Sequence, residues 1–252
     1  MKLIGIDSSG LVASVAIMED DKLVAEYTIN NKKTHSQTLL PMLDEIVKAA
    51  DLDMKEIDAI AIAAGPGSFT GLRIGSATAK GLGLALKKPV VPISTVDALA
   101  YNMYGTDCLV CPIMDARRNQ VYTGIYEFVK ENEQGDEAGE ELSSKFCKYR
   151  LNVVKEACAV PIEEIAGVIN EAGREVIFLG DGVPVFAEQL KELMKVPYSF
   201  TPAHLRLQKA GCVASLGAEK FKAGIYEDAD AHSPEYLRLS QAERERKEAG
   251  LL

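Results

Sequence analysis

The chain lacks features that several common functions require. Lysine plus arginine total 28 against 37 aspartate plus glutamate, for a net charge of −9 over 252 residues. This charge opposes direct attraction to a phosphate backbone, so we expect any RNA to be held through a partner. No apolar run is long enough to span a bilayer, and no signal-peptide core follows Met1. We therefore expect a cytoplasmic protein with no membrane contact.

Cysteine and histidine are scarce, with five and three residues. The cysteines are scattered and odd in number, so we expect free thiols. Cys108 and Cys111 have redox-like spacing but lie in an expected strand, and no second pair completes a zinc site. Leucine occupies the position four after His35, so no histidine pair shares a helix face, and no serine lies in a Gly-x-Ser-x-Gly elbow. Metal, redox and hydrolase chemistry therefore have no support.

What the sequence does contain is an alternation of strands and helices, with 47% apolar residues to build a sizeable core. The first thirty residues predict a meander of three short strands. Pro41 predicts that the following helix starts late or is kinked. The later alternation indicates an α/β fold with a partly parallel sheet. The elements expected here are strands 2–6, 11–18, 23–29, 58–64 and 90–93 and helices 39–50, 71–86 and 95–104.

Near residue 105 the pattern begins again. Each half opens with a strand, a turn led by an aspartate (Asp7 or Asp115) and a second strand. The repeat predicts two related lobes, residues 1–104 and 105–252. The helix expected over 207–223 could pack back on the first lobe.

The second half also contains a polar segment, residues 130–144, which we expect to be a flexible surface excursion. The tail after Tyr236 is charged, and we expect it to be mobile. The other elements expected here are strands 109–114, 121–129 and 176–179 and helices 162–172, 185–194 and 207–223.

The densest motif is the glycine-rich run 65–75, which joins an expected buried strand to a helix. Amides at a helix N-terminus favour a phosphate. However, the spacing misses the dinucleotide fingerprint by one residue, and no Gly-Lys-Ser/Thr follows. The run therefore favours a tight structural turn, and we expect no cofactor.

Two aspartates, Asp7 and Asp115, lie where a two-lobed ATPase would place acidic groups near a metal and phosphates. A third, Asp181, lies between two glycines in a segment that could cradle adenosine or simply turn the chain, and we favour the turn. The residues after Asp7 and Asp115 do not form a glycine-led phosphate loop. Aspartates that cap local amides are the commoner explanation. An ATP-dependent small-molecule kinase nevertheless remains the alternative function.

The helix after the glycine-rich run carries small residues every four positions. A glycine inside a helix costs roughly 1 kcal/mol relative to alanine, so a close packing contact must offset the loss. Two alternatives are open, packing inside the monomer or a helix–helix contact between subunits that also involves the preceding helix. The candidate interface residues are Leu39, Leu43, Ile46, Gly71, Gly75, Ala79 and Gly83.

Several motifs in order along nearly the whole chain resemble the TsaB (YeaZ) family. They are residues 4–9, 34–37, 65–75, 115–118 and 236–238. The resemblance implies an actin-like ATPase fold (ASKHA, ribonuclease H-like), with two related lobes of mixed sheets flanked by helices. It also implies that the two N-terminal-lobe helices named above form the subunit interface.

The implied role is a non-catalytic scaffold. Such a subunit binds the catalytic paralogue TsaD and, with it, the ATPase TsaE, and is a homodimer when alone. The complex attaches threonylcarbamoyl to N6 of the tRNA adenosine 3′ of the anticodon, and this chain would meet tRNA only through the complex. TsaD has a metal-binding histidine pair that His35 and Leu39 do not reproduce, so we expect no catalytic residue and no metal ligand.

Overall fold

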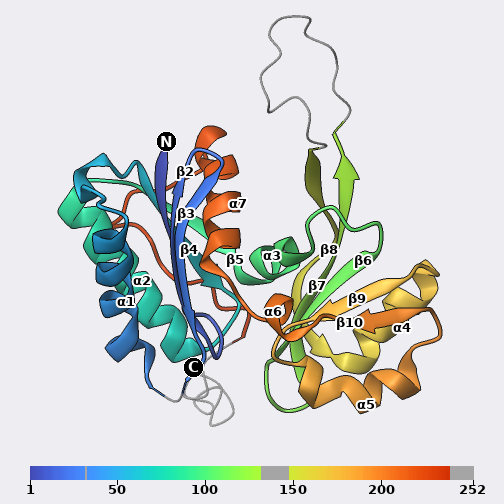
Figure 1. The fold of residues 1–252 in the computed structure, drawn as a ribbon. Coiled ribbons are helices and arrows are strands. Elements are labelled where there is room, and N and C mark those ends of the chain that lie inside the picture. The colour runs from blue at the N-terminus through green and yellow to red at the C-terminus, as the bar shows by residue number, and fades with distance from the viewer. Residues whose placement is uncertain (32, 132–147, 239–252) are drawn as a thin grey trace, which may run out of the picture.

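The structure is a computed structural model that describes residues 1–31, 33–131 and 148–238 (Figure 1). Two lobes lie side by side, each built on a five-stranded sheet. Residues 132–144 and the end of the tail, for which mobility was expected, lie outside the described residues. No helix in the described part of the chain is both long and apolar enough to cross a bilayer.

The first sheet has the strand order β3-β2-β1-β4-β5. Its first three strands form the expected antiparallel meander, and β4 and β5 add to it in parallel. The central strands β1 and β4 are almost wholly buried because helices cover both sheet faces. The strands are β1 (Lys2–Asp7), β2 (Ala13–Glu19), β3 (Lys22–Ile29), β4 (Ala59–Gly65) and β5 (Val90–Ser94).

The second sheet repeats this topology with the order β10-β9-β6-β7-β8. Again the first three strands in the chain form an antiparallel meander, and the last two add in parallel. The repeat confirms the prediction of two related lobes with mixed sheets. The strands are β6 (Leu109–Asp115), β7 (Gln120–Lys130), β8 (Tyr149–Pro161), β9 (Val176–Leu179) and β10 (Tyr198–Phe200).

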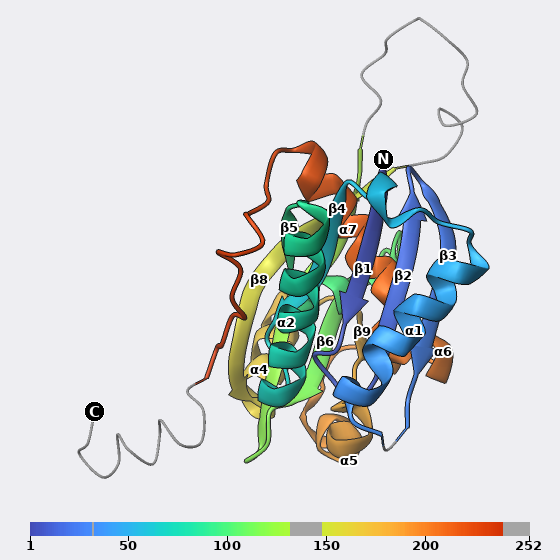
Figure 2. The same cartoon turned by 90° about the vertical axis from the view of Figure 1, so that its left-hand side faces the viewer.

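Helices cover both faces of the first sheet (Figures 1 and 2). On the outer face lie α1 (His35–Ala49) and α2 (Phe69–Leu86), and on the inner face α3 (Thr95–Ala100) and α7 (Ala210–Lys222). The second sheet carries α4 (Ile162–Ala172) and α5 (Val183–Leu193), and the short α6 (Ala203–Arg206) precedes α7. The described residues also form two 3₁₀ turns, Met54–Glu56 and Tyr101–Met103.

The start of α1 differs from the prediction. The helix begins at His35, after Thr34, and contains Pro41. The expected late start is therefore wrong. Pro41 removes the amide that would pair with the Gln37 carbonyl, and Gln37 is exposed, so that carbonyl can bind water instead.

Helix α7 returns the chain to the first lobe. It packs on β1, β2 and β4, and a β-carbon at Gly217 would lie only 2.5 Å from the β-carbon of Ala61. The small residues on both sides let the helix approach the sheet closely, and Val213 and Ala214 join Leu3 in one core cluster. The inner face of the first sheet is thus covered by a helix that follows the second lobe in the chain.

Candidate functional site

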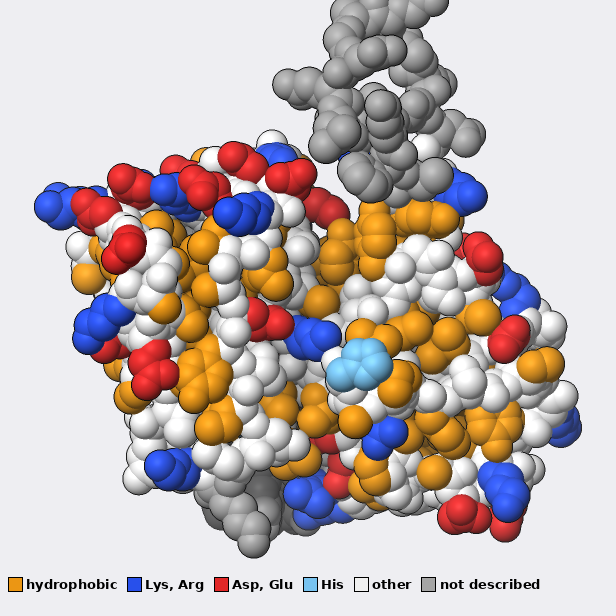
Figure 3. All heavy atoms as spheres, viewed as in Figure 1, with side chains coloured by type: hydrophobic (Ala, Val, Ile, Leu, Met, Phe, Trp, Pro, Cys, Tyr) orange, Lys and Arg blue, Asp and Glu red, His pale blue; other side chains and the backbone are white. Residues whose placement is uncertain are grey.

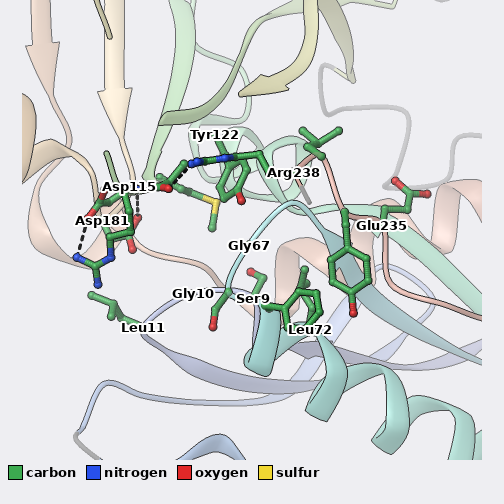
Figure 4. A pocket seen from close by; sticks show the side chains of 17 residues that line it. Ser9, Gly10, Leu11, Gly67, Leu72, Asp115, Tyr122, Asp181, Glu235 and Arg238 are labelled. Carbon is green, nitrogen blue, oxygen red and sulfur yellow. Dashed lines mark hydrogen bonds and ion pairs between the residues drawn. The ribbon is translucent and has the colours of Figure 1, made fainter. Parts of the chain in front are cut away.

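A cleft of ≈ 450 Å³ lies between the lobes, where β1, β4, β6 and β9 end (Figure 4). Carboxyl ends of parallel strands are the usual place for a ligand in α/β sheets. The structure brings the glycine-rich run and two of the three singled-out aspartates to this one cleft. Its walls include Ser9, Gly10, Gly67, Asp115, Arg117, Asp181, Glu235 and Arg238.

Asp7 lies behind the cleft wall and is completely buried. Its Oδ1 accepts hydrogen bonds from the Ser9 amide (2.9 Å) and the Ser9 hydroxyl (2.6 Å). Its Oδ2 has no partner among the described residues. Burial raises the pKa of Asp7 to about 6, although the bonds from Ser9 act in the opposite direction. Asp7 therefore caps its own turn, as the simpler sequence interpretation held.

The ionisation of Asp7 makes the chain less stable at neutral pH. Because its folded pKa, about 6, exceeds the ordinary value of 3.8, the stability it contributes is lost as pH rises from 4 to 6. At about 1.4 kcal/mol per pKa unit, the loss is about 3 kcal/mol. We expect Asp7→Asn to raise the free energy of unfolding at pH 8 by up to that amount, with no gain at pH 4. Urea unfolding at both pH values measures this.

Asp21→Asn is the matched control, because Asp21 is exposed on the β2–β3 turn. It should change the free energy of unfolding equally little at both pH values. If Asp7→Asn behaves in the same way, burial does not penalise the Asp7 charge.

The two aspartates that line the cleft are also engaged locally. Asp115 pairs with Arg117, whose guanidinium lies 3.0 Å from Oδ2 and whose amide donates to Oδ1. Asp181 accepts the Asp115 amide at 3.2 Å. Burial, together with the neighbouring Asp115 charge, raises the pKa of Asp181. Each carboxylate therefore fixes a turn of the cleft wall.

A further hydrogen-bonded chain was missed by the sequence analysis. The Ser76 hydroxyl lies 3.0 Å from Nε2 of His232, and Nδ1 of His232 lies 2.5 Å from Oε1 of Glu227. This is the order of groups in a serine hydrolase triad. However, Ser76 is 3% exposed and His232 1%, so a substrate cannot reach the hydroxyl. No sequence signal could reveal this series of hydrogen bonds, because 156 residues separate its serine and its histidine.

The seven candidate interface residues lie inside the first lobe. Leu39, Leu43, Ile46 and Ala79 belong to its core. The glycines admit close neighbours: a β-carbon at Gly71 or Gly75 would overlap Ser8, and one at Gly83 would lie 2.5 Å from Ala229. Packing inside the monomer therefore explains the small-residue strip. That α1 and α2 form an interface remains a prediction, but these seven residues lie on the buried sides of the two helices.

The opposite faces of the same two helices are exposed and lie side by side (Figure 2). Leu40 and Leu84 are 54% and 57% exposed. A β-carbon at Gly81 would meet no atom within 4 Å. We call this surface the outer helix face. It consists of Leu40, Pro41, Asp44, Arg73, Ala77, Gly81, Leu84 and Ala85.

Comparisons with known proteins agree with one another. A family model described as TsaD, tRNA N6-adenosine threonylcarbamoyltransferase, matches residues 22–246. The tRNA threonylcarbamoyladenosine biosynthesis protein TsaB of Bacillus subtilis is 31% identical over 248 residues, 96% of each chain. The protein of the same name from Escherichia coli is 33% identical over 146 residues, 57% of this chain and 62% of that protein.

Two solved structures from Pseudomonas aeruginosa are also similar. One is described as YeaZ, with a TM-score of 0.72 and 26% identity. The other is described as an uncharacterized protein with similarity to peptidase YeaZ, with a TM-score of 0.75 and 27% identity. Each alignment covers 94% of this chain and 99% of the other.

Two lobes that repeat one mixed sheet, with a cleft at the strand ends between them, define an actin-like ATPase fold of the ribonuclease H-like class. The similarity to the Bacillus subtilis protein extends over 96% of each chain and therefore identifies the family within this fold class. The chain belongs to the TsaB (YeaZ) family, within the broader group that the TsaD model describes.

This fold class implies a magnesium nucleotide in the cleft, but the residues present do not fit one. The Ser68 amide, at the start of α2, donates to the Ser9 carbonyl at 2.7 Å, which presses the glycine-rich loop onto the β1 turn. Arg117 is paired with Asp115, and Arg238 with the Ala116 carbonyl. Within the described ranges, no group of three acidic, histidine or cysteine side chains could hold a metal ion. A triphosphate would therefore meet carboxylates and occupied donors.

Proposed function

We propose that this protein is a non-catalytic scaffold subunit for N6-threonylcarbamoylation of the tRNA adenosine 3′ of the anticodon. It would pair with a TsaD-like catalytic subunit and, with it, a TsaE-like ATPase. The names of its curated relatives support a role in this modification. Such a role would place the protein in the cytoplasm.

The observation that carries the non-catalytic proposal is how the charged groups that line the cleft are bonded. Glu235 also lines the cleft and is exposed. The other four charged groups there, Asp115, Asp181, Arg117 and Arg238, are each bonded to a neighbouring turn. A catalytic acid, base or phosphate clamp needs a group directed at the substrate. These four groups instead hold the cleft walls together.

The outer helix face supports pairing with a TsaD-like subunit. The TsaD family model matches this chain, so such a partner would carry equivalent helices on its own first lobe. Two such faces can meet across a twofold or near-twofold axis, and small side chains at the centre allow close helix approach. A second copy of this chain would use the same face, so the homodimer and the TsaD pair would exclude each other.

Contact with tRNA would be indirect. The chain carries a net charge of −9. On the face drawn in Figure 3, the lysine and arginine side chains of the described residues are interspersed with acidic and apolar ones rather than gathered in one patch. Binding to a phosphate backbone would need a concentrated positive surface.

Reconstitution tests the proposal. Purified TsaD and TsaE from the same source are given tRNA and threonylcarbamoyl adenylate, with this chain present, omitted or replaced by Asp115→Asn. We expect modification to require the chain and to proceed at an unchanged rate with the variant. A chain that can be omitted would overturn the scaffold role. A variant that pairs with TsaD but blocks modification would show that the cleft takes part in catalysis.

The kinase alternative makes a different prediction for the chain alone. It requires magnesium-dependent ATP binding that Asp115→Asn abolishes. Calorimetric titration of the isolated chain with ATP and magnesium measures this, and we expect no such binding.

A further inference from the structure

The segment after α7 crosses the molecule without forming a helix or strand. We call residues 224–238 the C-terminal strap. It begins at the edge of the first sheet, where Glu227 and Val90 exchange two backbone hydrogen bonds of 2.9 Å. It then runs along α2 toward the cleft (Figure 2). The strap therefore links the far edge of the first lobe to the cleft mouth.

The middle of the strap is anchored deeply. His232 is buried between the Ser76 hydroxyl and the Glu227 carboxylate. The Lys80 ammonium donates to the carbonyls of Asp230 (2.9 Å) and His232 (3.0 Å). The Ser76–His232 hydrogen bond is buried, so it is costly to break because water cannot replace the lost partner. The anchor therefore fixes the strap to the middle of α2.

Near its end, the strap is held by the exposed contacts of Tyr236 and by the part-buried Arg238 hydrogen bond. The ring of Tyr236 lies 4.7 Å from that of Phe69, and its hydroxyl accepts a 3.2 Å hydrogen bond from Arg73. Tyr236 and Leu237 are 41% and 42% exposed. Water can compete for such contacts, so this end detaches more readily than the anchor.

The last described residue of the strap reaches the other lobe. The Arg238 guanidinium donates to the carbonyl of Ala116, in the turn after β6 (Figure 4). The main chain crosses between the lobes elsewhere, before β6 and after β10. There the Asn102 side-chain amide donates to the carbonyls of Leu205 and Leu207 and ties the two crossings together. The cleft thus has a tied hinge and, separately, a strap across its mouth.

We propose that the C-terminal strap is a latch on the interlobe cleft. Arg238 releases the second lobe while the His232 anchor stays in place, and the lobes then rotate apart about the Asn102 crossing. Hinged closure of this kind needs a few residues that absorb the rotation and a contact that differs between the two states. The Arg238–Ala116 hydrogen bond is that contact.

Distance measurement between the lobes tests the latch. Spin labels are placed at Lys55→Cys on the first lobe and Lys191→Cys on the second, after Cys108, Cys147, Cys158 and Cys212 are replaced by serine. Double electron–electron resonance then compares the distance between the two labels in Arg238→Ala with that in its parent. Loss of one charge-assisted hydrogen bond should raise the ratio of open to closed molecules about tenfold, seen as a longer and broader distance distribution.

Arg174→Ala is the matched control, because Arg174 pairs with Glu127 in the second lobe, outside the cleft lining. It should leave the distances unchanged. Hydrogen exchange at the Glu227 amide reports on the anchor and should be the same in Arg238→Ala as in the parent. Identical distances in Arg238→Ala and its parent would overturn the latch. Faster exchange at Glu227 would overturn the division into an anchored part and a releasable end.

Discussion

Gly81→Arg is expected to abolish pairing with the TsaD-like subunit while the chain stays folded. Gly81 is exposed on α2, and its β-carbon position is open space, so the free monomer can accept any side chain there. In a close helix pair, an arginine at the same place would separate the helices or bury its charge without a partner. We expect the dissociation constant to rise at least about 100-fold, as measured by calorimetric titration.

Gly167→Arg provides a matched control on the second lobe. Gly167 is also exposed, lies within α4 and has no atom within 4 Å of its β-carbon position. The two variants add the same charge and helix propensity, but only one lies on the outer helix face. If Gly167→Arg weakens pairing as much as Gly81→Arg, or if neither does, the partner does not use that face.

Gly75→Leu is expected to destabilise the chain severely. Its β-carbon would overlap the Ser8 hydroxyl and lie 3.1 Å from Ile62, in the packed layer between α2 and the sheet. The Ser8 hydroxyl also donates to the Gly71 carbonyl at 2.8 Å, so it cannot move without losing a buried hydrogen bond. Overpacking and this loss together should cost about 3 kcal/mol or more. The midpoint temperature of thermal unfolding should fall by about 10 °C.

Gly81→Leu is the control for this prediction, because it makes the same substitution six residues later on the exposed side of α2. It should raise stability by up to about 1 kcal/mol through helix propensity. If both variants are equally stable, the layer around Ser8 can accommodate a side chain. A loss of TsaD pairing in Gly75→Leu alone would reflect unfolding and not a lost subunit contact.

The sequence predicted the two-lobed architecture because the local signals repeat. Asp7 and Asp115 are each the last residue of a buried strand, and each caps the amide two residues later. The same local chemistry explains why Ser68 caps α2, where its hydroxyl accepts the Gly71 amide. Such contacts join residues close in the chain, so they leave a readable pattern.

Two strands of the second sheet could not be predicted. β8 lies at the sheet edge and mixes apolar residues with Asn152, Lys155 and Glu156, so its alternation is weak. β10 has three residues, too few for a period to show. The sheet, rather than their own sequence, defines them as strands.

Long-range packing explains why the sequence could not show that the candidate interface residues are buried within the first lobe. Spacing alone shows that Gly71, Gly75 and Gly83 share one side of α2, but not what covers that side. The covering atoms come from Ser8, more than sixty residues earlier for Gly71, and from Ala229, in the strap. The Ser76 hydroxyl likewise contacts His232, 156 residues away in the sequence, so the spacing of nearby residues could not reveal that contact either.

The return of α7 to the first lobe has a consequence for synthesis on the ribosome. The second sheet is made from one continuous stretch of chain, so it can close its core as soon as β10 emerges. The first sheet leaves the exit tunnel much earlier, yet Leu3 and Ala61 stay uncovered until Val213 and Ala214 arrive. The nascent chain therefore carries an exposed apolar sheet face through translation of the entire second lobe, and this is the interval in which chaperones would recognise it.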